Sequence, residues 1–93
     1  MSKGEYMRDI SIGQIVISTA GRDKNHKFVV LCIIDDKYVY ISDGNIRKLE
    51  KPKKKKLKHL KKLNYVAEDI KDRLESKGKL NNNEIRKLLK SID

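Results

Sequence analysis

The sequence predicts a mainly β fold with an α-helical extension, and three observations support this prediction. Four strand-like runs lie close together between residues 14 and 49, separated only by short polar turns. A lysine-rich segment follows around Pro52, and apolar residues then recur every three or four positions, as in amphipathic helices. A chain of 93 residues has room for one small domain and an extension. The close spacing favours a small meander barrel over a βαβ unit, whose crossover needs about a dozen residues or more.

The first two predicted strands, residues 14–19 and 27–34, differ in their apolar pattern. Ile15 and Ile17 mark one face of the first strand, whereas the second is apolar from Phe28 onward and rich in β-branched residues. We therefore expect the second strand to be central and buried on both faces, and the first to lie nearer an edge. Cys32, the only cysteine, is expected to be a small buried hydrophobe, and it indicates a reducing compartment.

The polar loop between these strands is the first candidate functional element. Gly21 adopts a positive φ at no steric cost, and Asn25 is the non-glycine residue that best tolerates the left-handed region. Both residues suit a tight bend. Such a bend directs the basic side chains of the loop into solvent, namely Arg22, Lys24, His26 and Lys27.

Two further strands are predicted at residues 38–42 and 45–49. Asp43-Gly44-Asn45 lies between them and is a strong hairpin signal, because glycine and asparagine accept a positive φ. Tyr38 and Tyr40 share one face of the third strand by its two-residue period. Stacking on unpaired bases is one role for these tyrosines. Covering the barrel or packing beneath the C-terminal helices is the favoured interpretation.

The positive charge of the chain is concentrated in one short segment. The whole chain carries a net charge of +10, of which +8 lies in residues 51–62. This segment contains no acidic residue, and such a block repels itself unless an anionic partner neutralises it. We expect it to become helical when its charge is neutralised. A purely solubilising linker is the alternative, but such linkers usually mix charges of both signs.

The C-terminal part is predicted to be helical. Leu57, Leu60 and Leu63 begin an apolar series with helical spacing, which Val66, Ile70 and Leu74 continue. Gly78 is a helix stop, and Asn81 with Glu84 forms a capping-box variant that opens a last helix. The apolar side of that helix is formed by Ile85, Leu88, Leu89 and Ile92. These helices are too short to be stable alone, so they pack either on the barrel, which is favoured, or on a partner.

The run from Ile12 to Asp36, with its Gly21-Arg22-Asp23-Lys24 loop and the following Phe28-Val29-Val30-Leu31 strand, resembles the KOW motif. More widely, residues 12–60 are similar to small stand-alone bacterial KOW-domain RNA-binding proteins and to related large-subunit ribosomal proteins of archaea and eukaryotes. The resemblance implies an SH3-like β-barrel whose first loops touch RNA. One departure is Asn25, where the motif usually has glycine. Asparagine adopts the same backbone region, but it hinders a close backbone approach to phosphate.

These observations divide the chain into four parts: a flexible N-terminus at residues 1–9, an SH3-like KOW barrel at 10–50, a lysine-rich RNA-binding extension at 51–62 and a helical tail at 63–93. The function we expect is RNA binding, with structured ribosomal RNA as the partner. Ribosomal proteins or a translation factor would lie nearby. The expected RNA contacts are Arg22, Lys24, Asn25, His26, Lys27, Lys51, Lys53, Lys54, Lys55, Lys56, Lys58, Lys61 and Lys62.

Catalysis is not expected. The chain offers no nucleophile with an adjacent base, no paired carboxylates in a cleft and no metal ligands at workable spacing. We also expect no cofactor, no small-molecule substrate and no membrane association, and we expect a cytoplasmic location. The alternative function is that of an SH3-like interaction module, which would dock on a transcription or translation factor through its apolar C-terminal helices.

Overall fold

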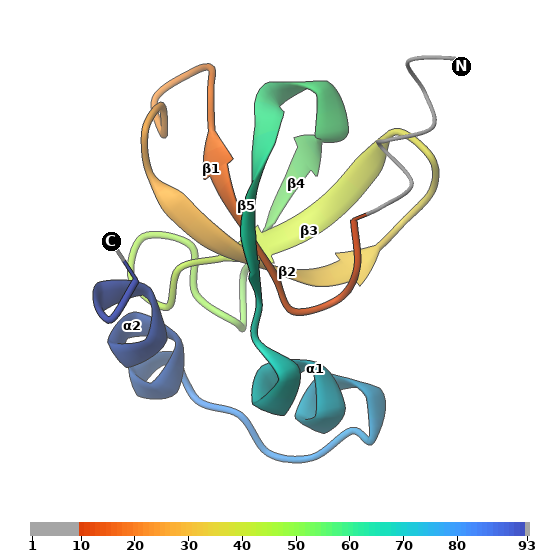
Figure 1. The fold of residues 1–93 in the computed structure, drawn as a ribbon, viewed down its shortest axis with the longest axis vertical. Coiled ribbons are helices and arrows are strands. Elements are labelled where there is room, and N and C mark those ends of the chain that lie inside the picture. The colour runs from red at the N-terminus through yellow and green to blue at the C-terminus, as the bar shows by residue number, and fades with distance from the viewer. Residues whose placement is uncertain (1–9, 93) are drawn as a thin grey trace.

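A computed structural model describes residues 10–92 and shows an antiparallel β-sheet with two α-helices (Figure 1). The strands are β1 (Gln14–Ser18), β2 (Lys27–Ile33), β3 (Tyr38–Ser42), β4 (Lys53–Lys56) and β5 (Leu60–Val66). A 3-10 helix, η2 (Leu57–His59), joins β4 to β5, and α1 (Glu68–Glu75) and α2 (Asn82–Lys90) follow. The mainly β prediction is therefore confirmed. The flexible N-terminus predicted at residues 1–9 lies outside the described residues.

The strand order in the sheet is β4-β3-β2-β1-β5. β1 to β4 form a meander, and β5 then returns to pair with the free side of β1. β2 is the middle strand, as the sequence predicts, and β1 lies one position nearer an edge. Within residues 10–92 no strand pairing joins β4 to β5, so these two strands form the open edges of the sheet.

The turn between β1 and β2 has the predicted backbone conformation, but the end of β2 does not have the predicted burial. Gly21 has φ of 79° and Asn25 has φ of 72°. Residues 28–30 are buried on both faces, whereas Cys32 and Ile33 are exposed. The prediction of a buried cysteine is therefore wrong. The end of β2 extends beyond the apolar residues that pack beneath the helices, because Leu31 is the last residue of β2 among them.

The strand predicted at residues 45–49 is absent from the structure. One carboxylate oxygen of Asp43 accepts hydrogen bonds from the backbone N–H groups of Asn45, at 2.9 Å, and Arg47, at 2.8 Å. The hydroxyl of Ser42 also donates to the Arg47 carbonyl at 2.6 Å. These local bonds hold the backbone in a turn, as short polar side chains often do. The fourth strand is β4, in the lysine-rich segment.

The predicted helix over the lysine-rich segment is also wrong, because this segment forms β4, η2 and the start of β5. The sheet has an apolar cluster on each face, described below, and Leu60 packs against one of them and Leu63 against the other. Residues three apart lie on opposite faces of a strand, so the spacing that suggests a helical stripe instead serves both sides of a sheet. Pro52 immediately precedes β4, so the sheet continues beyond this proline.

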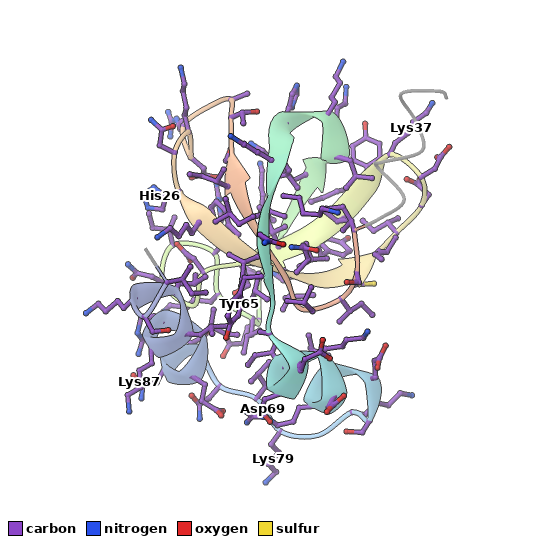
Figure 2. The ribbon with its side chains drawn as sticks, viewed as in Figure 1. His26, Lys37, Tyr65, Asp69, Lys79 and Lys87 are labelled. Atoms are coloured by element: carbon purple, nitrogen blue, oxygen red, sulfur yellow. The ribbon has the colours of Figure 1, made fainter. Side chains whose placement is uncertain are left out.

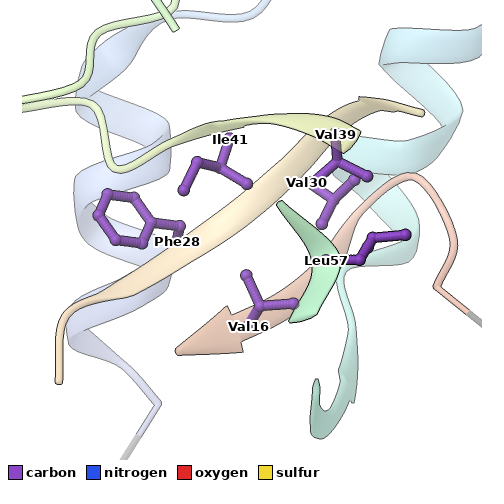
Figure 3. Packing of buried hydrophobic residues seen from close by; sticks show 6 residues of the cluster. All are labelled: Val16, Phe28, Val30, Val39, Ile41 and Leu57. Carbon is purple, nitrogen blue, oxygen red and sulfur yellow. The ribbon is translucent and has the colours of Figure 1, made fainter. Parts of the chain in front are cut away.

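Two apolar clusters lie on opposite faces of the sheet. Figure 3 shows the first, which consists of Val16, Phe28, Val30, Val39, Ile41 and Leu57. The second is centred on Ile15, Val29, Ala67, Ile70 and Ile85, and it includes the partly buried apolar residues of both helices. The alternation between adjacent residues of β1 and β2 follows from the two-residue period of a strand. The helices thus fold back on the sheet, which was the favoured prediction.

Both helix ends near the α1–α2 connection have well-defined hydrogen bonding. The predicted capping box at the start of α2 is confirmed, with Asn81 and Glu84 each bonding the other's backbone N–H. After α1, Lys77 takes a positive φ of 59°, and the Gly78 N–H donates to the Arg73 carbonyl at 2.7 Å. Lysine, rather than the predicted glycine, therefore occupies the left-handed position that ends α1. Arg73 also pairs with Glu84, which links the two helices.

Candidate nucleic-acid interface

Three connections lie on the side of the sheet away from the helices, and η2 lies between the other two, the β1–β2 loop and the β2–β3 turn (Figure 1). The Thr19 N–H donates to the His59 carbonyl at 2.9 Å, which joins the β1–β2 loop to η2. The Leu57 N–H donates to the Lys37 carbonyl at 2.8 Å, which joins η2 to the β2–β3 turn. These backbone bonds fix three separate segments as one surface. Its basic residues are Arg22, Lys24, Lys37, Lys55, Lys56 and Lys58, and we call this surface the cationic end.

The β1–β2 loop presents its basic residues because its acidic residue turns inward. The side chain of Asp23 is only 8% exposed and pairs with Arg47 of the β3–β4 connection at 3.1 Å. The Asn25 N–H closes the loop by donating to the Ser18 carbonyl at 2.7 Å. Arg22 and Lys24 are left exposed, as predicted, and their charges are not neutralised by the aspartate between them.

The lysines of β4 alternate between two environments. Lys54 and Lys56 are exposed, whereas Lys53 and Lys55 are half-buried. The Lys55 ammonium donates to the Ala20 carbonyl at 3.3 Å, and so links β4 to the β1–β2 loop. Long lysine stems can cover apolar surface in this way while the ammonium stays near solvent. One lysine of β4 thus helps to hold the cationic end together.

The structure brings only part of the predicted site together. The cationic end contains the predicted residues Arg22, Lys24, Lys55, Lys56 and Lys58. Asn25, His26 and Lys27 instead line a separate groove of about 390 Å³ beside α2. The Lys27 ammonium donates to the Ile92 carbonyl, so the prediction that it points freely into solvent is wrong. The other predicted lysines lie before β4 or along the sheet edges, namely Lys51, Lys53, Lys54, Lys61 and Lys62.

Lys37 is the one basic residue of the cationic end that the sequence analysis did not name, and it lies beside Tyr38, for which base stacking was the less favoured role. They line a groove of about 440 Å³ together with Lys56, Leu57, Lys58 and Asp36. Lys56 is the cross-strand partner of Tyr38. Recognising the lysine run as a strand would have predicted this pairing. A strand that follows β3 and pairs with it in antiparallel fashion places its lysines opposite the tyrosines of β3.

The two tyrosines of β3 do share one face, as predicted. Val39 and Ile41, on the other face of β3, are fully buried in the first apolar cluster. Tyr40 is 37% exposed. Neither tyrosine belongs to the cluster beneath the helices, so packing there, one of the two roles in the favoured interpretation, is wrong. Their partners across the ladder are the exposed lysines, Lys56 opposite Tyr38 and Lys54 opposite Tyr40. The Lys54 ammonium lies 4.7 Å from the centroid of the Tyr38 ring.

Other kinds of site find little support in the described part of the chain. Among residues 10–92, no group of three or more histidine, cysteine, aspartate or glutamate side chains is placed to hold a metal ion. No helix within these residues is long and apolar enough to span a membrane. The exposed ammonium and guanidinium groups of the cationic end can bind anions.

Neither models of known protein families nor curated protein sequences give a match to this chain. The KOW resemblance therefore rests on the motif residues alone.

Proposed function

We propose that this chain is an RNA-binding protein with an SH3-like barrel of the KOW type. In this proposal the cationic end contacts the phosphates of structured RNA, and the natural partner is ribosomal RNA. The strand order and the single 3-10 turn between β4 and β5 are compatible with such a barrel. The observation that carries the proposal is that backbone hydrogen bonds join η2 to both the β1–β2 loop and the β2–β3 turn, and that all three connections carry exposed basic residues.

The composition of this surface favours phosphate contacts over reading of base edges. Five of its six basic residues are lysines, which are point charges on flexible stems and carry little sequence information. Arg22 is the one residue able to make a flat, bidentate contact with a phosphate or a guanine edge. Recognition would then depend on the shape of the RNA more than on its sequence.

Charge alone does not choose between RNA and duplex DNA, and RNA is proposed on the KOW resemblance. That resemblance also underlies a ribosome-associated role in the cytoplasm, with ribosomal proteins or a translation factor as neighbours. We propose no enzymatic activity, cofactor or membrane association.

The alternative function, docking on a protein partner through the C-terminal helices, needs an apolar surface on those helices. Ile70 and Ile85 are buried against the sheet, and Leu74, Leu88 and Leu89 pack on the same cluster. Truncation after Lys62 would remove most of β5 and both helices and would uncover this cluster. The full chain is therefore the right material for every test of function.

The test is a salt titration of the full chain on a labelled, structured fragment of ribosomal RNA. If the cationic end neutralises about six phosphates, raising salt from about 50 to 200 mM should weaken binding on the order of 10³-fold. A loss of about threefold or less would refute the phosphate clamp. Sedimentation of cell lysate through sucrose gradients at low and high salt tests the ribosome separately. Co-sedimentation only at low salt is expected, and a protein that never leaves the top of the gradient would refute ribosome association.

A further inference from the structure

The groove between the β2–β3 turn and η2 combines an aromatic ring with several cations. We call it the Tyr38 groove; it has a volume of about 440 Å³ and is lined by Asp36, Lys37, Tyr38, Lys56, Leu57 and Lys58. Its three lysines outnumber its single carboxylate, so the groove is electropositive. Its volume falls in the range of roughly 300–1,000 Å³ that is typical of small-ligand sites.

The walls of the Tyr38 groove are fixed by hydrogen bonds. A carboxylate oxygen of Asp35 accepts from the N–H groups of Lys37, at 2.8 Å, and Tyr38, at 2.9 Å, which holds the β2–β3 turn. The Leu57 N–H bonds to the Lys37 carbonyl at 2.8 Å and ties the opposite wall to this turn. Tyr38 is also paired with Lys56 across the ladder. The groove therefore exists before any ligand binds, which lowers the entropic cost of binding.

We propose that the Tyr38 groove binds one unpaired nucleotide of the RNA, an inference that rests on the proposed function. The base stacks on the Tyr38 ring face that Lys54 leaves free, and the adjoining phosphate lies among Lys37, Lys56 and Lys58. An aromatic face with neighbouring cations is the combination that single-stranded nucleic-acid sites use, because every base has a π-face. A paired base is already stacked within its helix and cannot reach the ring. The groove thus adds a preference for a bulge, loop or end to a surface that otherwise binds phosphates.

The proposal also assigns an opposing role to Asp36. Among residues 10–92, this exposed side chain is the only acidic group lining the groove, and a carboxylate beside a bound phosphate repels it. Asp36→Asn should therefore bind RNA more tightly than the wild type. Asp72→Asn, an equal charge change on an exposed residue of α1, serves as its matched control.

The experiment compares two fluorescent probes on the full chain: a single-stranded oligouridine of about ten nucleotides and an RNA duplex of similar charge. Tyr38→Leu should weaken binding of the oligouridine on the order of 5- to 100-fold, with little change for the duplex. Tyr40→Leu is the control, because Tyr40 lies on the same face of β3 outside the groove. Tyr38→Phe keeps the ring and should bind like the wild type. Unchanged duplex binding by Tyr38→Leu separates the loss of stacking from a folding defect of this variant.

The results separate this inference from the function beneath it. If Tyr38→Leu and Tyr40→Leu bind the oligouridine equally well, the nucleotide site is refuted while the phosphate clamp stands. If the wild type binds neither probe in a salt-dependent way, both proposals fail. Cross-linking of 4-thiouridine RNA to the wild-type chain needs no variant. Cross-links should map to the peptides that contain Tyr38 or Lys58, and their restriction to Tyr65 or the helices would overturn the assignment.

Discussion

Removing two loop lysines from the cationic end should change the salt dependence of RNA binding by a calculable amount. Lys24 lies in the β1–β2 loop and Lys58 in η2, and both are exposed and outside the strands. The double variant Lys24→Ser, Lys58→Ser loses two phosphate contacts. Each contact contributes about 0.9 to the slope of log affinity against log salt, so the slope should fall by about 1.8. Over a fourfold rise in salt, the variant should lose about 12-fold less affinity than the wild type.

The matched control is Lys79→Ser, Lys87→Ser, which lowers the net charge of +10 by the same two units. Both control lysines lie at the helix end of the molecule, away from the cationic end (Figure 2). Fluorescence anisotropy with one RNA hairpin at several salt concentrations gives all three slopes. Equal slopes for the two double variants would show that binding follows net charge and not the cationic end, which would refute the assigned surface.

Three further predictions concern the packing of the helices. Gly44→Ala should lower the thermal midpoint, because at a φ of +73° its Cβ would lie 2.4 Å from a carbonyl oxygen of α2. The Cβ of Gly78→Ala meets nothing nearer than 3.5 Å, so this control should leave the midpoint unchanged. Equal shifts for the two variants would contradict the contact at Gly44. Ile85→Ala removes a fully buried side chain and should reduce the free energy of unfolding in urea by about 2–5 kcal/mol, and a loss well below that range would show that α2 is held by other contacts. The hydrogen bond from Arg73 lowers the pKa of Glu84, so this carboxylate stabilises the fold fully above its ordinary pKa of 4.5 and loses that effect as the pH falls through the lower folded value. Urea midpoints measured from about pH 6 down to about pH 3 should fall less steeply for Glu84→Gln than for the wild type, and parallel curves would exclude the ion pair as a source of stability.

The strands and turns that depend on local chemistry could be predicted from the sequence. β1, β2 and β3 were expected from their apolar runs, and Gly21 and Asn25 take the positive φ values that their residue types suggest. The capping box of α2 has an equally local cause, since its two side chains bond backbone groups three residues away. In each case the determining contacts lie within a few residues of the pattern.

The lysine-rich segment could not be placed in this way, because partners far along the chain decide its conformation. Lysine is less frequent in strands than average, so its residue type does not predict β4. β4 forms because its backbone pairs with the free edge of β3. Leu60 and Leu63 each find an apolar cluster on a different side of the sheet, a choice that spacing alone cannot reveal. The Tyr38 groove depends on the pairing of β3 with β4. The groove could not be predicted from the sequence because β4 was not predicted.

The position of β4 at the edge of the sheet has a consequence for the free protein. An unpaired strand edge is a template for pairing with another chain, and natural proteins often protect such edges with lysine. Here the edge strand consists of four consecutive lysines, so two copies that met along β4 would place like charges opposite each other. Lys55 and Lys56, which belong to the cationic end, thereby also oppose self-association and aggregation. Serine replacements along β4 would remove this protection together with the binding charge, whereas changes in the loops keep the two effects apart.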